Sequence, residues 1–139
     1  MIKYAVLFPF LIEMILMKME ATALMLGITK GVAAISIDSE NGALGPIYTR
    51  AVKGHIQRGK RSEDDPATNY LGVALEKIAV MKATSMNSGV FQKVKNGETK
   101  YRGGLVQVVG CYTVYVAFSG GTEDQDVEVA KIAMKSLCS

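Results

Sequence analysis

The chain has 139 residues, of which 49% are hydrophobic and 21% are charged, and its formal net charge is +3 at pH 7. This length and balance are typical of one folded domain with its own core, and they exclude an intrinsically disordered chain. A charge of +3 is too small to indicate nucleic acid binding by itself. We therefore expect a single domain over residues 1–139 without a nucleic-acid partner.

Histidine and cysteine are scarce. His55 is the only histidine, which excludes a histidine-containing catalytic triad or a multi-histidine metal site within one chain. The two cysteines, Cys111 and Cys138, fit neither a zinc motif nor a disulfide framework. Two unpaired thiols are typical of a reducing compartment, so we expect a cytoplasmic protein.

The N-terminal region begins with an apolar run, YAVLFPFLI, at residues 4–12. This run is far shorter than the roughly 20 residues that cross a bilayer. Glu13 and Lys18 follow it closely, without a cleavage site of small residues. We therefore interpret residues 1–10 as an N-terminal extension rather than a signal peptide, and we expect no membrane association.

Residues 11–26 predict the first main helix, because they include strong helix formers, contain no Gly or Pro, and are followed by Gly27. The polar residues of this helix do not gather on one face, since Glu13 and Lys18, for example, fall on opposite sides. The helix is therefore apolar nearly all round. Such a helix is usually covered on more than one side. A sheet together with a partner subunit, or with the N-terminal segment, would cover it.

Two strands are predicted next, at residues 31–38 and near residues 47–52, with a turn at residues 39–42 between them. Residues 50–61 then carry five basic side chains and no acidic one. This basic stretch has two interpretations, a solvated sheet edge or an anion-binding patch.

A second helix is predicted from Pro66 to about Asn87, with Asp65 as its N-cap and Gly89 ending it. The next segment, residues 90–102, fits either a hairpin or a short helix.

The C-terminal third has the clearest pattern. Residues 105–109 and 112–119 predict a hairpin with a Gly–Cys turn, and Thr122 with Gln125 forms the capping box of a last helix. Hairpins indicate an antiparallel sheet with helices on its faces.

Two glycine-rich spots, Gly103–Gly104 and residues 119–121, match neither common phosphate-binding motif. The second precedes a helix N-terminus, which favours anions, but Glu123, Asp124 and Asp126 lie in the same turn and would repel them. We interpret these glycines as turn residues.

The segment 103–137 resembles the C-terminal signature of the GlcG/HbpS-like family. The residues that carry the resemblance are Gly103–Gly104, Gly110, Ser119–Gly120, Gln125–Asp126 and Ala130, with Asp38 and Lys82–Ala83 earlier in the chain. The resemblance covers about residues 10–138 and is loose between residues 43 and 70.

The resemblance implies an α+β domain, a three-layer α/β/α arrangement with a profilin-like, mainly antiparallel five-stranded sheet. It implies a homo-oligomer (dimer, tetramer or octamer) that binds a small-molecule ligand, and haem or a corrinoid as possible cofactors. It implies no catalytic residue. The candidate ligand-binding residues are His55, Lys82, Gly103, Gly104, Ser119 and Gly120.

This chain departs from the haem-binding relatives, which share a histidine near the first helix. His55, Tyr101 or a methionine remain as alternative iron ligands, and Arg50, Lys53 and Arg58 as partners for a carboxylate.

We expect a non-catalytic, small-molecule-binding module. The alternatives are an enzyme acting on a small organic acid, with Asp38, Asp126 and Lys82 as candidates, and a purely structural or protein-interaction subunit.

Overall fold

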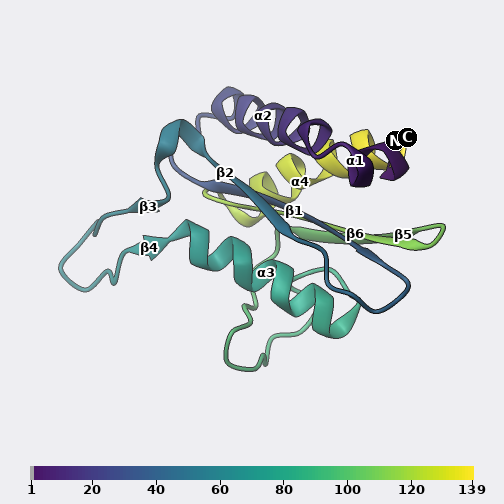
Figure 1. Cartoon of the computed structure of the whole chain (residues 1–139). Coiled ribbons are helices and arrows are strands. Elements are labelled where there is room, and N and C mark those ends of the chain that lie inside the picture. The colour runs from purple at the N-terminus through teal and green to yellow at the C-terminus, as the bar shows by residue number, and fades with distance from the viewer. Residues whose placement is uncertain (1) are drawn as a thin grey trace.

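The computed structural model describes residues 2–139, which form four α-helices, a four-stranded antiparallel sheet and a separate two-stranded sheet (Figure 1). In chain order the elements are α1 (Ile2–Leu7), α2 (Phe10–Met25), β1 (Val32–Ser39), β2 (Ile47–Ala51), the 3-10 turn η1 (Val52–Gly54), β3 (Gln57–Arg58), β4 (Thr68–Asn69), α3 (Tyr70–Thr84), β5 (Gly104–Val109), β6 (Tyr112–Ser119) and α4 (Glu123–Cys138).

The main sheet has the strand order β2-β1-β6-β5, and every neighbouring pair is antiparallel. The α+β class and the antiparallel sheet are therefore confirmed. The expected count of five strands is wrong, because residues 90–102 form no strand, and β3 and β4 pair only with each other. The pair β3–β4 closes a projecting segment, residues 57–69, which we call the basic arm after Arg58, Lys60 and Arg61, although three acidic residues that follow them balance their charge.

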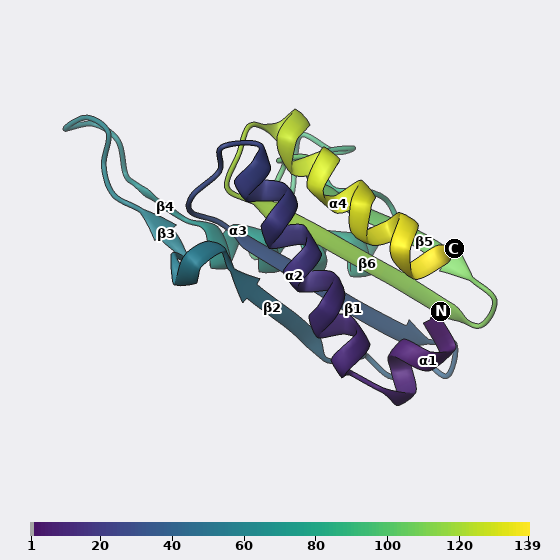
Figure 2. The same cartoon turned by 90° about the horizontal axis from the view of Figure 1, so that it is seen from above.

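Both faces of the sheet are covered by helices. Alternate residues of β1 point to opposite sides, and both sets are apolar, so each face holds a core. Helices α2 and α4 lie side by side on one face, where Ile35 and Phe118 join the larger core cluster (Figure 2). Helix α3 lies on the other face, where Ile78 packs with Tyr115.

The predicted start of the second helix is wrong. Helix α3 begins at Tyr70 rather than at Pro66, and its N-cap is Asn69, whose side-chain oxygen accepts from the Gly72 amide. Ala67 has a φ of +70°, which is not a helical conformation and separates Pro66 from the helix. Asp65 instead accepts from the Ala67 amide within the basic arm.

The C-terminal prediction is confirmed. Strands β5 and β6 form the hairpin, and the Thr122–Gln125 capping box makes both of its hydrogen bonds. At the other end, residues 2–7 of the expected extension form α1, with Ile2 and Ala5 inside the larger core cluster. No helix in the described part of the chain is long and apolar enough to cross a membrane.

Candidate functional site

A cleft of about 980 Å³ lies at the end of the sheet where β1 begins and β6 ends. Five segments form its walls: the α2–β1 turn, the basic arm, the first half of α3, the α3–β5 connection and the β6–α4 turn with the start of α4. The residues that line it are Leu26, Gly27, Ile28, Thr29, Lys30, Arg58, Gly59, Lys60, Arg61, Thr68, Tyr70, Val73, Lys77, Tyr101, Ser119, Gly120, Gly121, Thr122, Glu123, Gln125 and Asp126.

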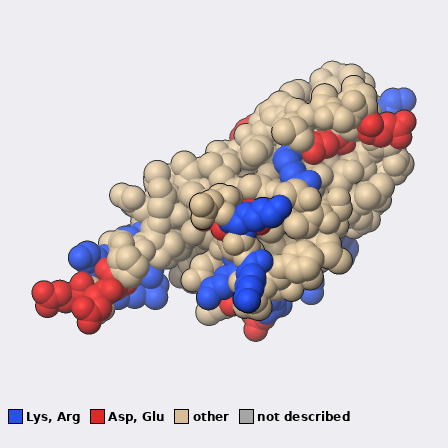
Figure 3. Space-filling model, turned by 90° about the horizontal axis from the view of Figure 1, so that it is seen from below, with Lys and Arg blue, Asp and Glu red and all other residues tan. Residues whose placement is uncertain are grey.

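The cleft has more basic than acidic side chains. The Arg58 guanidinium binds Asp65 at 2.6 Å, and this contact, together with hydrogen bonds from the Arg61 and Ala67 amides, lowers the pKa of Asp65 to about 2. None of the ion pairs found in residues 2–139 involves Lys30, Lys60 or Arg61. Figure 3 shows acidic side chains at the tip of the arm, with basic ones beside them. The acidic residues of the tip, Glu63 and Asp64, do not line the cleft, whereas Lys30, Lys60 and Arg61 do. These three cations are therefore available to an anion in the cleft.

A buried ion pair lies in the cleft wall between α3 and α4. The Lys77 ammonium donates to the Phe118 carbonyl at 2.6 Å and to Asp126 Oδ2 at 3.1 Å, and Lys77 is only 1% exposed. Asp126 Oδ1 accepts from the Gly121 amide at 2.8 Å. Burial lowers the pKa of Lys77 and raises the pKa of Asp126 to about 6, while the opposite charge of each partner counteracts these shifts.

The candidate residues of the two glycine-rich spots are divided between the cleft and the packing behind it. Ser119 and Gly120 line the cleft. Gly103 lies against the buried ion pair, where a Cβ atom would be 2.6 Å from Lys77 Nζ. Gly104 packs against Met81, and its amide donates to the Ser88 hydroxyl.

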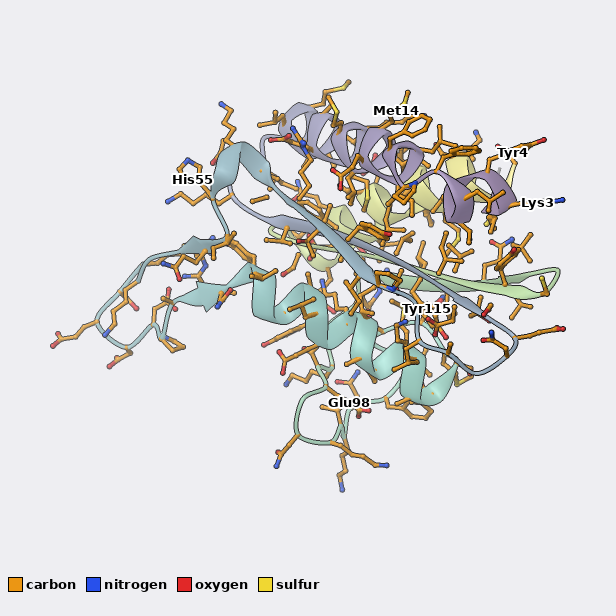
Figure 4. The ribbon with its side chains drawn as sticks, in the orientation of Figure 1. Lys3, Tyr4, Met14, His55, Glu98 and Tyr115 are labelled. Atoms are coloured by element: carbon orange, nitrogen blue, oxygen red, sulfur yellow. The ribbon has the colours of Figure 1, made fainter. Side chains whose placement is uncertain are left out.

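Lys82 and Asp38 form a second polar cluster, outside the cleft. The Lys82 ammonium is 2.6 Å from Asp38 Oδ1 and 2.9 Å from Ser36 Oγ, and it lies 4.8 Å from the centre of the Tyr115 ring (Figure 4). Burial, followed by the charge of Asp38, raises the pKa of Tyr115. Asp38 Oδ1 also accepts from the Gly45 amide at 2.6 Å, so this cluster holds the β1–β2 connection against α3.

His55 lies apart from all of these residues. It follows η1, it is exposed, and its side chain points away from the fold (Figure 4). The basic stretch around it is split between two places. Arg50 and the Lys53 amide bind Glu20 of α2, whereas Arg58 lies in the cleft.

Lys77 is the main functional candidate that sequence reasoning missed. It lies three residues after Ala74 and four before Met81, so it shares their buried helix face. A lysine at a core position of a helix is the signal that would have identified it, because an amine is almost never fully buried without a partner.

The cleft does not fit a haem. No histidine, cysteine or methionine is among its lining residues, and Tyr70 and Tyr101 are the only side chains there that resemble a known iron ligand. The walls are also rich in glycine and charge rather than in the apolar side chains that a porphyrin needs.

Comparisons with known proteins support the fold. No protein-family model and no curated protein matches the chain. The fold is similar to the crystal structure of Ybr137w protein, with a TM-score of 0.52 at 13% identity over 86% of this chain and 73% of that one. A second similar structure, the Klebsiella pneumoniae protein ORFY of the DUF336 (GlcG/HbpS-like) family, has a TM-score of 0.45 at 18% identity over 86% and 81% of the two chains. The structural likeness concerns the fold alone.

Proposed function

We propose that this chain is a small-molecule-binding module of the GlcG/HbpS-like type, assembled as a homo-oligomer, and that its ligand is a small organic acid bound in the cleft. The three-layer, profilin-like arrangement implied by the family resemblance is part of this proposal. The observation that carries it is the placement of Lys30, Lys60 and Arg61, without an ion-pair partner, around one concave site.

The side chains, rather than the helix N-terminus, would hold the carboxylate. The Gly121 and Thr122 amides at the start of α4 already donate to Asp126 and Gln125. An arginine presents two parallel N–H donors that match a carboxylate, and a lysine adds a mobile point charge. Arg61 and Lys60 of the basic arm therefore supply both kinds of contact.

The volume of the cleft agrees with a small ligand. Small-molecule sites usually occupy about 300–1,000 Å³ and combine apolar walls with a few polar anchors. This cleft, at about 980 Å³, lies at the upper end of that range, and its polar anchors outnumber its few apolar side chains, which include Ile28 and Val73. An organic acid with a short carbon chain would place its carboxylate on the arm and its apolar part on α3.

We expect the double variant K60A/R61A to weaken binding of a di- or tricarboxylate at least about tenfold, which corresponds to about 1.4 kcal/mol. Isothermal titration calorimetry with succinate and citrate measures the effect. The matched control is K93A/K95A, which removes the same charge from exposed positions outside the cleft. An equal loss in both variants would mean unspecific attraction, and no binding by the unsubstituted chain would refute the proposal.

An enzyme acting on the same acid is the second candidate function. Asp126 favours it, because a carboxyl with a pKa near 6 in a cleft wall is suited to proton transfer. Both Asp126 oxygens are engaged by Lys77 and Gly121, which favours a structural role. Turnover of a bound acid that D126N abolishes without weakening its binding would establish the enzyme.

Haem is expected to give no specific signal. Added haemin should produce no saturable Soret shift that depends on His55, because that side chain is exposed and outside the cleft. Absorbance titrations of the unsubstituted chain and of H55A should coincide. A saturable shift that H55A removes would contradict this prediction.

A further inference from the structure

The outer face of α2 carries a row of large exposed apolar side chains. Phe10 is 60% exposed, Met14 is 61% exposed and Met17 is 53% exposed, although α2 lies directly on the sheet. Figure 2 looks onto this face, and Figure 4 shows that Met14 points away from the sheet. The buried residues of α2, such as Leu16 and Met19, occupy the opposite side.

The row has the spacing of a helix–helix seam. Phe10, Met14, Met17 and Ala21 follow one another at intervals of four, three and four residues, which is the a/d pattern of a coiled coil. Glu13 and Lys18, both exposed, lie on opposite flanks of this seam. With Phe10 and Met17 at d positions and Met14 and Ala21 at a positions, Glu13 occupies a g position. Lys18 then occupies an e position.

We propose that the seam is the contact with a second copy of this chain, in which the two α2 helices pack in parallel around a two-fold axis along the helices. In a parallel pair, a g residue faces the e residue five positions later in the partner. Glu13 of each copy would then face Lys18 of the other, twice in the dimer. An antiparallel pair would place equal flanks together, acid against acid and base against base.

A second copy explains the seam better than a membrane surface does. Helices that lie on membranes carry mostly Lys and Arg on their polar flanks, whereas the exposed charged residues that flank this seam are one acid and one base. Helix α2 alone, with 16 residues, is about 24 Å long. The exposed Leu7 and Phe8 extend the apolar surface beyond its N-terminal end, toward the size that a stable dimer needs.

The proposed dimer rests on the homo-oligomer proposed above and specifies its contact, and it can be tested separately from ligand binding, since none of the seam residues lines the cleft. Light scattering and sedimentation equilibrium between about 1 and 100 μM should give the mass of a dimer. The variant M14K/M17K should weaken the dimer at least about tenfold while its far-UV circular dichroism spectrum stays unchanged, because both side chains are exposed. M86K, at an exposed methionine beyond the end of α3, is the matched control.

A charge exchange tests the parallel orientation. E13K alone and K18E alone should each weaken the dimer severalfold, because each places like charges opposite one another. The double variant E13K/K18E should restore the association, since it re-creates opposite charges between the two copies. An antiparallel pair would show no such restoration.

Three results would overturn the proposal. They are a monomer at every concentration, a dimer that M14K/M17K leaves intact, and a monomer that binds neutral phosphatidylcholine vesicles through Met14 and Met17. A failure of the charge exchange alone would overturn the parallel orientation. None of these results depends on whether succinate or citrate binds in the cleft.

Discussion

The variant K77A is expected to lower the free energy of unfolding by about 3–5 kcal/mol at pH 7, the range for breaking a buried ion pair. Lys77 is among the largest fully buried side chains of the chain, so truncation leaves a cavity. It also removes the cation beside Asp126 and the donor to the Phe118 carbonyl. Urea unfolding followed by circular dichroism measures the loss.

K77M separates the loss of packing from the loss of charge. Methionine keeps most of the apolar volume, so K77M should cost less than K77A. An equal cost would mean that packing contributes little and that the charge accounts for the effect.

The pH dependence of K77M tests the electrostatic coupling. Because burial raises the pKa of Asp126 to about 6, above its unfolded value of 3.8, the stability from this group is fully present below about pH 4 and lost as the pH rises through 6. Removing the cation raises this pKa further, so the loss in K77M continues to a higher pH. The cost of K77M relative to the unsubstituted chain should therefore increase between pH 5 and pH 8. A cost that is independent of pH would contradict the coupling, and K77M/D126N, which lacks the carboxyl, should show no increase.

Elements with local signals could be predicted from the sequence. The hairpin of β5 and β6 and the start of α4 follow from a Gly–Cys turn and from a capping box that spans three residues. The start of α3 could not, because the positive φ of Ala67 and the arm contacts of Asp65 are set by tertiary structure. The fifth strand was implied by the family resemblance, and the segment whose pattern also fitted a hairpin, residues 90–102, forms no strand.

The candidate site was predictable only in parts. The basic stretch at residues 50–61 suggested an anion site, but only the fold shows that Arg58, Lys60 and Arg61 share a cleft with the β6–α4 turn. Lys77 and Asp126 are separated by 49 residues, and no local rule joins them. Lys82, a candidate ligand-binding residue, lies outside the cleft, where Asp38, 44 residues away, binds its ammonium group.

The variant G103A is expected to destabilise the fold by about 3 kcal/mol or more. Gly103 has a φ of +117°, a conformation that residues with a side chain rarely adopt. An added Cβ would also be 2.6 Å from Asp126 Cβ and 2.8 Å from the Phe118 carbonyl oxygen. The Phe118 carbonyl belongs to the backbone of a central strand and cannot move away cheaply, so the ion pair or the strand must shift.

G97A is the matched control for this prediction. Gly97 also has a positive φ, +87°, but a Cβ there would meet no atom within 4 Å. Its replacement should cost about 1 kcal/mol, the conformational penalty alone. Thermal unfolding of both variants followed by circular dichroism gives the comparison. If G103A costs no more than G97A, the close approach between Gly103 and the ion pair does not restrict this position, and its role in holding Lys77 and Asp126 in the cleft wall is refuted.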